Sequence, residues 1–243
     1  MRPLLFLLLF LVLHTSAQTT ENMRLFLLIG QSNMAGRGKV TPADQQTHPR
    51  IFTLDPSNAW VPAKDPLHFD KPKVAGVGLA SEFARRAAAK DPSAVIGLIP
   101  CAFGGTSLDQ WAPGSALYTN AVARARLALQ NGRLAGILWH QGEADSAPQK
   151  TATYPARFAA MIARLRADLS APDAPVLVGE LGHFRPASLP FNQMLPSLPA
   201  AVPRCALVSA ADLGHGGDAL HFSADALRAF GARYFDALES LNP

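Results

Sequence analysis

The sequence has few features of membrane proteins, metalloproteins or nucleotide-binding proteins. After residue 13 no stretch is apolar enough to span a bilayer. No cysteine and histidine spacing resembles a zinc site, and no Gly-Lys-Ser/Thr follows a glycine-rich loop. Internal repeats, low-complexity tracts and interdomain linkers are also missing. We therefore expect no metal, no organic cofactor and no membrane span in the mature protein.

The charges of the chain give no evidence for a nucleic-acid partner. Lys and Arg number 22 against 18 Asp and Glu, which gives a formal net charge of +4. The basic residues are scattered along the sequence and form no stripe or cluster. We predict neither nucleic-acid binding nor stable membrane association.

Only two cysteines are present, Cys101 and Cys205. Cys101 follows one expected strand at its carboxyl end, and Cys205 precedes another at its amino end. If these strands are parallel, the two thiols lie at opposite edges of the sheet and are too far apart for a disulfide. We predict free, buried thiols.

The first residues have the pattern of a cleavable signal peptide. Met1 and Arg2 precede the apolar run Leu4–Leu13, and small or polar residues lead to Ala17. The run is too short to cross a bilayer easily, and no cysteine follows it to carry a lipid. Cleavage before Gln18 is therefore favoured over a retained anchor. We predict a secreted or periplasmic protein with one domain over residues 18–243.

Short apolar runs alternate with longer helical patterns, which is typical of a mostly parallel sheet covered by helices. The expected strands are 25–29, 94–100, 135–139, 175–180 and 206–209, with 51–54 as a weaker candidate. The expected helices are 79–90, 117–130, a stripe over 158–169, and a last helix with Ser223 as its N-cap. The Pro-rich stretch 186–203 is interpreted as a surface excursion.

Ser32 directly follows the first strand, in Gly30-Gln31-Ser32-Asn33-Met34. Ligands of open α/β sheets bind beyond the carboxyl ends of the strands, so a hydroxyl there can meet a substrate. Gly30 permits a sharp turn, and N–H groups after Ser32 would face developing negative charge. The alternative is a serine that only caps a helix. The segment is not the G-x-S-x-G motif of α/β-hydrolases.

Two further segments follow strands at the same edge. Gly104 and Gly105 let the main chain approach a ligand, so the Gly104 N–H could stabilise an oxyanion, although a glycine pair is more often only a turn. In Trp139-His140-Gln141-Gly142-Glu143, Gln141 could donate its amide hydrogens to an oxyanion, and Glu143 could orient a base. His140 alternates with Gln141 and is expected to pack on the other face of the sheet.

The segment Asp218-Ala219-Leu220-His221 comes just before the last helix. Its three-residue spacing lets one turn hold a carboxylate against an imidazole, as a hydrolytic serine requires. A solvated surface pair is the alternative. His215 is a rival base without a carboxylate at the same spacing. Together the four segments offer a nucleophile, a base, an acid and oxyanion donors.

These four blocks, in this order, resemble the SGNH hydrolase superfamily. The resemblance is to its sialate O-acetylesterase-like branch, which includes the acetylxylan esterases of carbohydrate esterase family six. It runs from about Arg24 to the last helix. It implies a flavodoxin-like three-layer α/β/α sandwich.

The resemblance also implies roles for individual residues. Ser32 would be the nucleophile, His221 the base and Asp218 its partner, and the N–H groups of Ser32 and Gly104 would form the oxyanion hole. The superfamily has an Asn in its third block where this chain has Gln141-Gly142-Glu143. Gln141 is then the candidate third oxyanion donor, and Glu143 is an alternative carboxylate for His221 or a residue that organises the loop.

The resulting prediction is a secreted serine esterase that removes O-acetyl groups from carbohydrates, on a polysaccharide or sialic acid type of substrate, through an acetyl-Ser32 intermediate. Two alternatives stay open. One is an esterase for lipids or thioesters, which would need a long apolar groove. The other is a carbohydrate-binding relative without catalysis. Trp60, Phe103 and Trp111 are candidates to flank a sugar ring.

Overall fold

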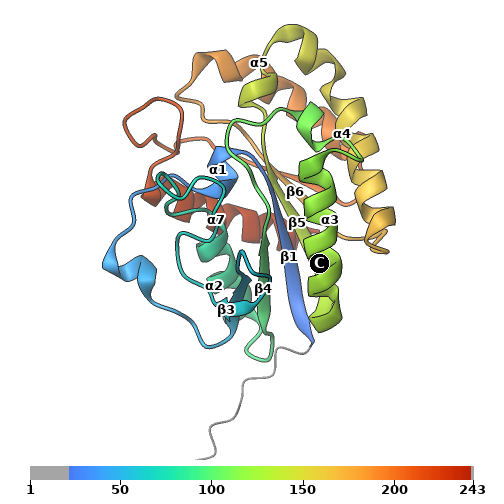
Figure 1. Cartoon of the computed structure of the whole chain (residues 1–243). Coiled ribbons are helices and arrows are strands. Elements are labelled where there is room, and N and C mark those ends of the chain that lie inside the picture. Colours follow the sequence, from blue (N-terminus) through green and yellow to red (C-terminus); the bar gives the residue numbers. More distant parts are fainter. Residues whose placement is uncertain (1–21, 242–243) are drawn as a thin grey trace, which may run out of the picture.

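The computed structural model describes residues 22–241, which form a seven-stranded sheet with helices on both faces (Figure 1). The strand order is β3-β2-β4-β1-β5-β6-β7. All neighbouring strands are parallel except β3, which pairs antiparallel with β2 at one edge. The strands are β1 (Met23–Gly30), β2 (Ile51–Leu54), β3 (Trp60–Pro62), β4 (Ile96–Pro100), β5 (Gly132–His140), β6 (Val176–Gly179) and β7 (Cys205–Val208). The predicted leader lies outside the described residues.

All six predicted strands are present, with ends that differ by up to three residues. β1 lies in the middle of the sheet because it pairs with both β4 and β5. All of its residues except Arg24 are buried, which explains the unbroken apolar run that follows Arg24. β3 was not predicted, and it is a three-residue edge strand that ends in a proline.

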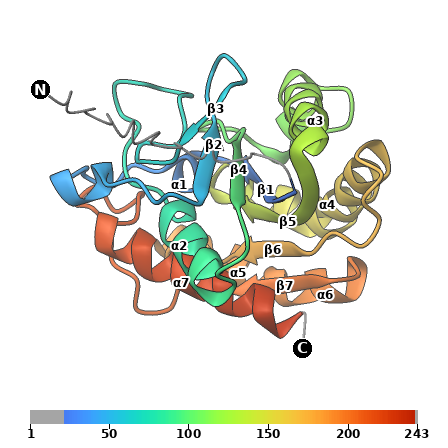
Figure 2. The ribbon, with the colours of Figure 1, turned by 90° about the horizontal axis from the view of Figure 1, so that it is seen from below.

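The helices form two layers, one on each face of the sheet, as Figure 2 shows. One apolar core lies under α2 and α7, and the other lies under α3, α4, α5 and α6. This is the predicted three-layer α/β/α sandwich. The helices are α1 (Ser32–Ala35), α2 (Ala80–Lys90), α3 (Ala116–Ala128), α4 (Pro148–Asp168), α5 (Leu189–Met194), α6 (Leu198–Ala201) and α7 (Ala224–Ser240).

Helix ends follow their capping residues. Ser223 caps α7, as predicted, because its side chain accepts a hydrogen bond from the Ala226 N–H. α4 begins ten residues before the predicted stripe, with Pro148 in its first turn, where a missing N–H costs nothing.

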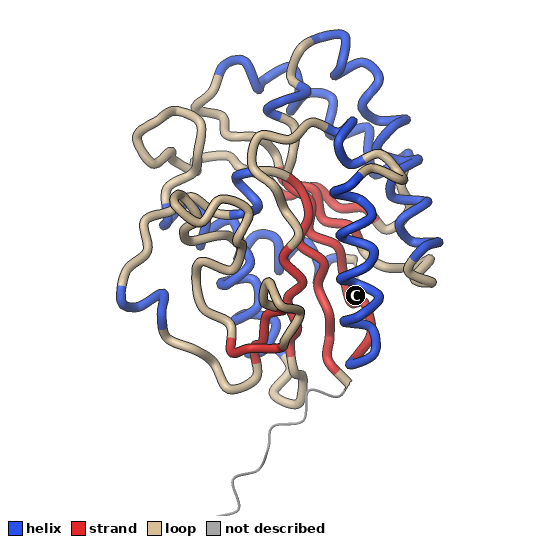
Figure 3. The backbone as a smooth tube through the Cα atoms, viewed as in Figure 1, coloured by secondary structure: helices blue, strands red, loops and turns tan. Residues whose placement is uncertain are grey.

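The interpretation of residues 186–203 as a surface excursion is wrong. Figure 3 shows helical turns there, and these are α5, α6 and two 3₁₀ turns. Each begins with a proline in its first turn, where proline favours a helix. Phe191, Leu195 and Leu198 are buried in the core beside α4. The prolines therefore start short helices and do not mark an exposed loop.

The two cysteines are free and buried, as predicted. Burial raises the pKa of the Cys101 thiol to about 12 and that of Cys205 to about 11, so both thiols are protonated and unreactive at neutral pH. None of the helices described between residues 22 and 241 is long and apolar enough to cross a membrane.

Candidate active site

Ser32 lies at the carboxyl end of β1, at the first residue of α1 (Figure 1). The turn depends on Gly30, whose φ is 132°. A Cβ on Gly30 would lie 2.1 Å from the carbonyl oxygen of His140, so no other residue fits between β1 and β5. The Gln31 N–H then donates to that same carbonyl at 2.9 Å. The strand pairing thus fixes the chain on which the serine stands.

His221, the predicted base, reaches Ser32 from the far end of the chain. His221 Nε2 lies 3.0 Å from Ser32 Oγ, although the two residues are 189 positions apart. Both side chains are only slightly exposed, but neither is sealed from solvent. The distance is that of a hydrogen bond between a nucleophile and its general base.

Asp218 lies on the other side of the imidazole. Its Oδ2 is 2.5 Å from His221 Nδ1, and its Oδ1 accepts the N–H groups of Leu220 and His221. Partial burial would raise the pKa of Asp218, but the hydrogen bonds from His221 and Leu220 lower it to about 2. Asp218 is therefore ionised at neutral pH and faces the imidazole nitrogen that does not face the serine.

Glu143 does not contact His221 in this arrangement. Its Oε1 accepts a hydrogen bond from Asn33 Nδ2 at 2.6 Å. Asn33 Nδ2 also donates to the Leu220 carbonyl, and its Oδ1 accepts the Phe222 N–H. Asn33 therefore holds the backbone on both sides of His221, and Glu143 holds Asn33. No role for Asn33 was predicted from the sequence.

Gln141 is fully buried, and its amide is directed at other protein groups. Its Nε2 donates to Asp145 Oδ2 at 2.6 Å and to the Thr106 carbonyl at 3.1 Å, and its Oε1 accepts the Tyr154 hydroxyl at 2.8 Å. The amide hydrogens are used within the core, so the structure does not present Gln141 as the expected oxyanion donor. Gln141 instead ties the loops after β4 and β5 together.

Gly104 lies next to Ser32, but its N–H also has a partner inside the protein. A Cβ on Gly104 would be 3.4 Å from Ser32 Cβ, which places this glycine beside the nucleophile. Its N–H donates to Asp70 Oδ2 at 2.8 Å. In this structure the Gly104 N–H therefore has a partner within the protein, and its role as an oxyanion donor stays a prediction. No sequence pattern pointed to Asp70, which lies in the connection between β3 and α2.

The remaining histidine candidates are structural. His215 Nδ1 accepts the N–H groups of Gly217 and Ala219 and so shapes the turn before Asp218. His140 is completely buried on the face opposite Gln141, as expected, where its ring packs edge-on against Phe222 and Phe230. Neither histidine contacts Ser32.

Of the three aromatic candidates, only Phe103 is exposed beside the site. Its side chain is 40% exposed, and the Lys71 ammonium lies 5.8 Å from its ring centre. Trp111 is buried and donates to Thr106 Oγ1, whereas Trp60 donates to Asn131 and packs against the core. Phe103 is therefore the aromatic side chain available to a ligand at Ser32.

A hollow of about 350 Å³ opens next to the histidine. It is lined by Arg37, Lys39, Asp218, His221 and Ser223, together with glycine, alanine and Phe222 positions. The lining is short of aliphatic side chains and rich in polar and charged groups. Such a surface fits a hydroxylated ligand better than a long acyl chain.

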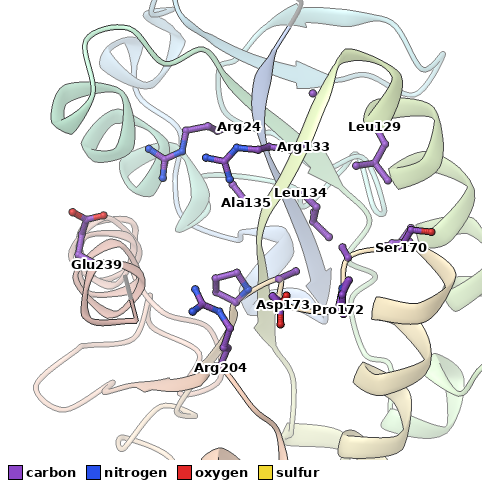
Figure 4. A pocket seen from close by; sticks show the side chains of 15 residues that line it. Arg24, Leu129, Arg133, Leu134, Ala135, Ser170, Pro172, Asp173, Arg204 and Glu239 are labelled. Carbon is purple, nitrogen blue, oxygen red and sulfur yellow. The ribbon is translucent and has the colours of Figure 1, made fainter. Parts of the chain in front are cut away.

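A larger hollow of about 730 Å³ lies at the opposite edge of the sheet, next to the amino end of β1 (Figure 4). Figure 4 shows Arg24, Arg133 and Arg204 around it, with Asp173 and Glu239 nearby. It contains no serine and histidine pair, so we do not consider it the active site despite its size. Within residues 22–241 no cluster of three or more His, Cys, Asp or Glu side chains could hold a metal ion.

Comparison with known proteins identifies the family. Residues 22–240 match the model of the carbohydrate esterases described as sialic acid-specific acetylesterases. The chain belongs to this family. Membership confirms the predicted resemblance and makes the chain a carboxylic ester hydrolase of the carbohydrate acetylesterase type.

Individual relatives agree with this assignment. A probable carbohydrate esterase of Arabidopsis thaliana is 36% identical over 174 residues, which cover 63% of this chain and 67% of that protein. Its X-ray structure superimposes with a TM-score of 0.83 and 31% identity, over 90% of this chain and 98% of that one. The fold of this relative is therefore shared over nearly its whole length.

Two more distant structures share the fold. NanS has a TM-score of 0.74 at 21% identity, with 90% of this chain and 97% of that chain covered. A carbohydrate acetylesterase from Xanthomonas citri has a TM-score of 0.68 at 20% identity and covers 90% of this chain and 56% of that chain. These likenesses confirm the three-layer architecture.

Proposed function

We propose that this chain is an exported serine esterase that hydrolyses O-acetyl esters of carbohydrates through an acetyl-Ser32 intermediate. The observation that carries the proposal is the hydrogen-bonded series from Ser32 Oγ to His221 Nε2 and from His221 Nδ1 to Asp218. All three residues belong to blocks that the sequence had already singled out. Family membership supplies the carbohydrate acetyl ester as the class of substrate.

The geometry supports a two-step mechanism. Ser32 Oγ attacks the acetyl carbonyl while His221 Nε2 takes the hydroxyl proton, and the same imidazolium then protonates the departing sugar hydroxyl. In the second step His221 takes a proton from the water that attacks the acetyl-serine, and it returns this proton to Ser32 Oγ as the acyl bond breaks and acetate leaves. Asp218 fixes the tautomer of His221 and stabilises the imidazolium.

The negative charge of each tetrahedral intermediate forms next to Ser32. We propose the Ser32 N–H, the first of α1, as an oxyanion donor, because the start of a helix leaves N–H groups without an intrahelical partner. Gly104 contributes by its position beside Ser32, with its own N–H bound to Asp70. We assign Gln141 and Glu143 to the support of the loops.

The polar hollow beside His221 favours carbohydrate over lipid substrates. Arg37, Lys39 and Ser223 line it, and Phe222 is the one large apolar side chain in the lining, which is little apolar surface for a long acyl chain. Phe103, which directly precedes Gly104 in the sequence, supplies an exposed ring. We propose that a sugar ring packs near Phe103 while its acetyl group points to Ser32.

The test is acetate release from a panel of acetylated glycans by the wild-type chain and by Ser32→Ala. The wild type should release acetate, and Ser32→Ala should be slower by at least about a thousandfold because it lacks the nucleophile. The Ser32 side chain is small and lies at the end of the sheet, so thermal unfolding should change little. Activity of Ser32→Ala within tenfold of the wild type would remove Ser32 from the mechanism.

A further inference from the structure

A buried ion pair that the proposed mechanism does not use lies beside the nucleophile. Arg37 Nη2 is 2.7 Å from Asp70 Oδ2, and the two side chains are only 7% and 1% exposed. The same carboxylate oxygen accepts the Gly104 N–H. One oxygen atom thus links the arginine that follows α1 to the glycine next to Ser32.

The local backbone fixes both members of this pair. Arg37 directly follows α1, and its Nη1 donates to the Gly36 carbonyl at 2.7 Å. The connection that carries Asp70 is bound to the same segment, because Gly76 donates to the Gly36 carbonyl and Gly38 donates to the Val77 carbonyl. The segments that carry Arg37 and Asp70 are therefore held together, and the Asp70 side chain binds both Arg37 and Gly104.

The ion pair and Ser32 come closest to each other at Gly104. A Cβ at this position would lie 2.5 Å from Arg37 Nη2, 3.1 Å from Asp70 Oδ2 and 3.4 Å from Ser32 Cβ. Any other residue would push the guanidinium away from the carboxylate. The glycine thus lets the ion pair pack directly against the reacting serine.

This position has an electrostatic consequence for ester hydrolysis. The acyl oxygen of the substrate becomes negative at Ser32 during the reaction. A fixed carboxylate a few ångströms away would repel that charge, and burial would leave the repulsion poorly screened. A guanidinium on the same carboxylate oxygen cancels the repulsion while the carboxylate keeps its bond to Gly104.

We propose that Arg37 neutralises Asp70, so that this carboxylate can fix Gly104 beside Ser32 without opposing the oxyanion that forms there. Arg37 and Asp70 are positioning residues, because both act through Gly104 and the field at Ser32. The inference rests on the proposed serine mechanism. It concerns turnover more than binding of the ester in its ground state, which carries no charge.

The competing explanation is that the pair only holds two loops together. That explanation predicts that loss of either partner is harmful and that loss of both is at least as harmful. Neutralisation predicts a different order, because the arginine is needed only while the carboxylate is charged. Removing the charge of Asp70 should then make Arg37 dispensable.

The experiment measures kcat and KM for p-nitrophenyl acetate with R37Q, R37K, D70N and the double variant R37Q/D70N. We expect R37Q to lose about a hundredfold in kcat, with KM within threefold of the wild type. D70N should stay within about threefold, because Asn keeps an oxygen for the Gly104 N–H. R37Q/D70N should recover at least tenfold over R37Q, and R37K should retain more activity than R37Q.

Arg166→Gln is the matched control. Arg166 is also 7% exposed, but it donates to the Ala174 and Pro203 carbonyls at the opposite edge of the sheet. Its loss should lower the melting temperature without changing kcat. Circular dichroism and thermal unfolding of every variant separate loss of fold from loss of turnover.

Two outcomes would overturn the proposal. One is a double variant no faster than R37Q, and the other is a folded D70N that is slower than the wild type by about a hundredfold. The D70N result would overturn the proposal even if R37Q does not fold. Failure of the serine mechanism itself would be visible separately, as wild-type protein without esterase activity or as full activity of Ser32→Ala.

Discussion

The Asp218 carboxylate uses both of its oxygens on the segment that carries His221. One oxygen accepts two backbone N–H groups, and the other lies against the imidazole. Glu143 has a different partner, since it binds Asn33. The two acids that the sequence left as alternatives therefore occupy different places in the site.

Asp218→Asn should reduce turnover far more than Glu143→Gln does. An amide at position 218 can donate to the imidazole and favour the wrong tautomer, which costs up to about ten-thousandfold in turnover. Gln at position 143 keeps an oxygen that can accept from Asn33, so we expect a loss of about tenfold or less. The measurement is kcat for acetate release at equal folded protein. The reverse order would make Glu143 the partner of His221.

Asp65 is a buried acid outside the catalytic residues. Its Oδ1 accepts the Gly78 N–H at 3.3 Å, but burial dominates and raises its pKa to about 6. A folded-state pKa above the ordinary value of 3.8 means that its contribution to stability is full below pH 3.8. That contribution is lost as the pH rises through 6, because the folded protein must then hold a buried charge.

Asp65→Asn should therefore raise the free energy of unfolding more at pH 8 than at pH 5. The gain in the free energy of unfolding should be about 1–3 kcal/mol, the order expected for a shift of this size. Urea unfolding of both proteins at pH 5, 6.5 and 8 measures it. An effect of the substitution that is independent of pH would show that Asp65 is not the group that titrates.

Asn33 connects two elements that are far apart in sequence. It lies in α1, and its amide binds the backbone on both sides of His221, just before α7. The N-cap Ser223 adds a second anchor, because its N–H donates to the Gly214 carbonyl while its side chain caps α7. The position of His221 relative to Ser32 therefore depends on contacts between α1 and the segment before α7.

Asn33→Ala should misplace His221 without removing any reacting group. We expect kcat to fall by about tenfold to a hundredfold, since small displacements of a catalytic group have effects of this order. KM should change less. Steady-state kinetics with an acetyl ester give both values, and Ser115→Ala serves as a control that weakens α3, away from the site, by about 1 kcal/mol. Equal losses for the two variants would contradict a specific role for Asn33.

The elements with the clearest apolar patterns in the sequence could be predicted. β1, β4, β5 and β6 are buried strands with continuous apolar runs, and the apolar stripe of α7 follows a serine cap. β3 was not predictable because three partly exposed residues at an edge carry no periodic signal. α5 and α6 were missed because prolines that begin short helices look the same in sequence as prolines in a loop.

The residues of the candidate site could be predicted where they are close in sequence or follow strands that end at the same edge of the sheet. Asp218 and His221 are three residues apart, and Ser32 directly follows a central strand. The contacts of Gly104 with Asp70 and of Glu143 with Asn33 depend on how loops 34 and 110 residues apart pack together. Donors and acceptors can be recognised in the sequence, but their pairing cannot, so the partners of Gly104 and Gln141 within the protein were not predicted.

The export of the molecule is a separate prediction, because the leader lies outside the described residues. Residues 1–17 have the composition of a signal peptide, so the product recovered from the cell envelope or medium should begin at or near Gln18. N-terminal sequencing of protein expressed with its full leader measures this. Mature protein that starts at Met1 and needs detergent for extraction would show a retained anchor.

β1 separates the start of the described chain from the edge of the sheet that carries Ser32. The strand enters the sheet at Met23 and reaches the serine edge only after eight residues, or about 26 Å at 3.3 Å per residue. A tether attached ahead of Met23, such as a resin linker or a fused binding module, therefore holds the enzyme by its inert end. The edge with Ser32 and His221 then faces away from the tether.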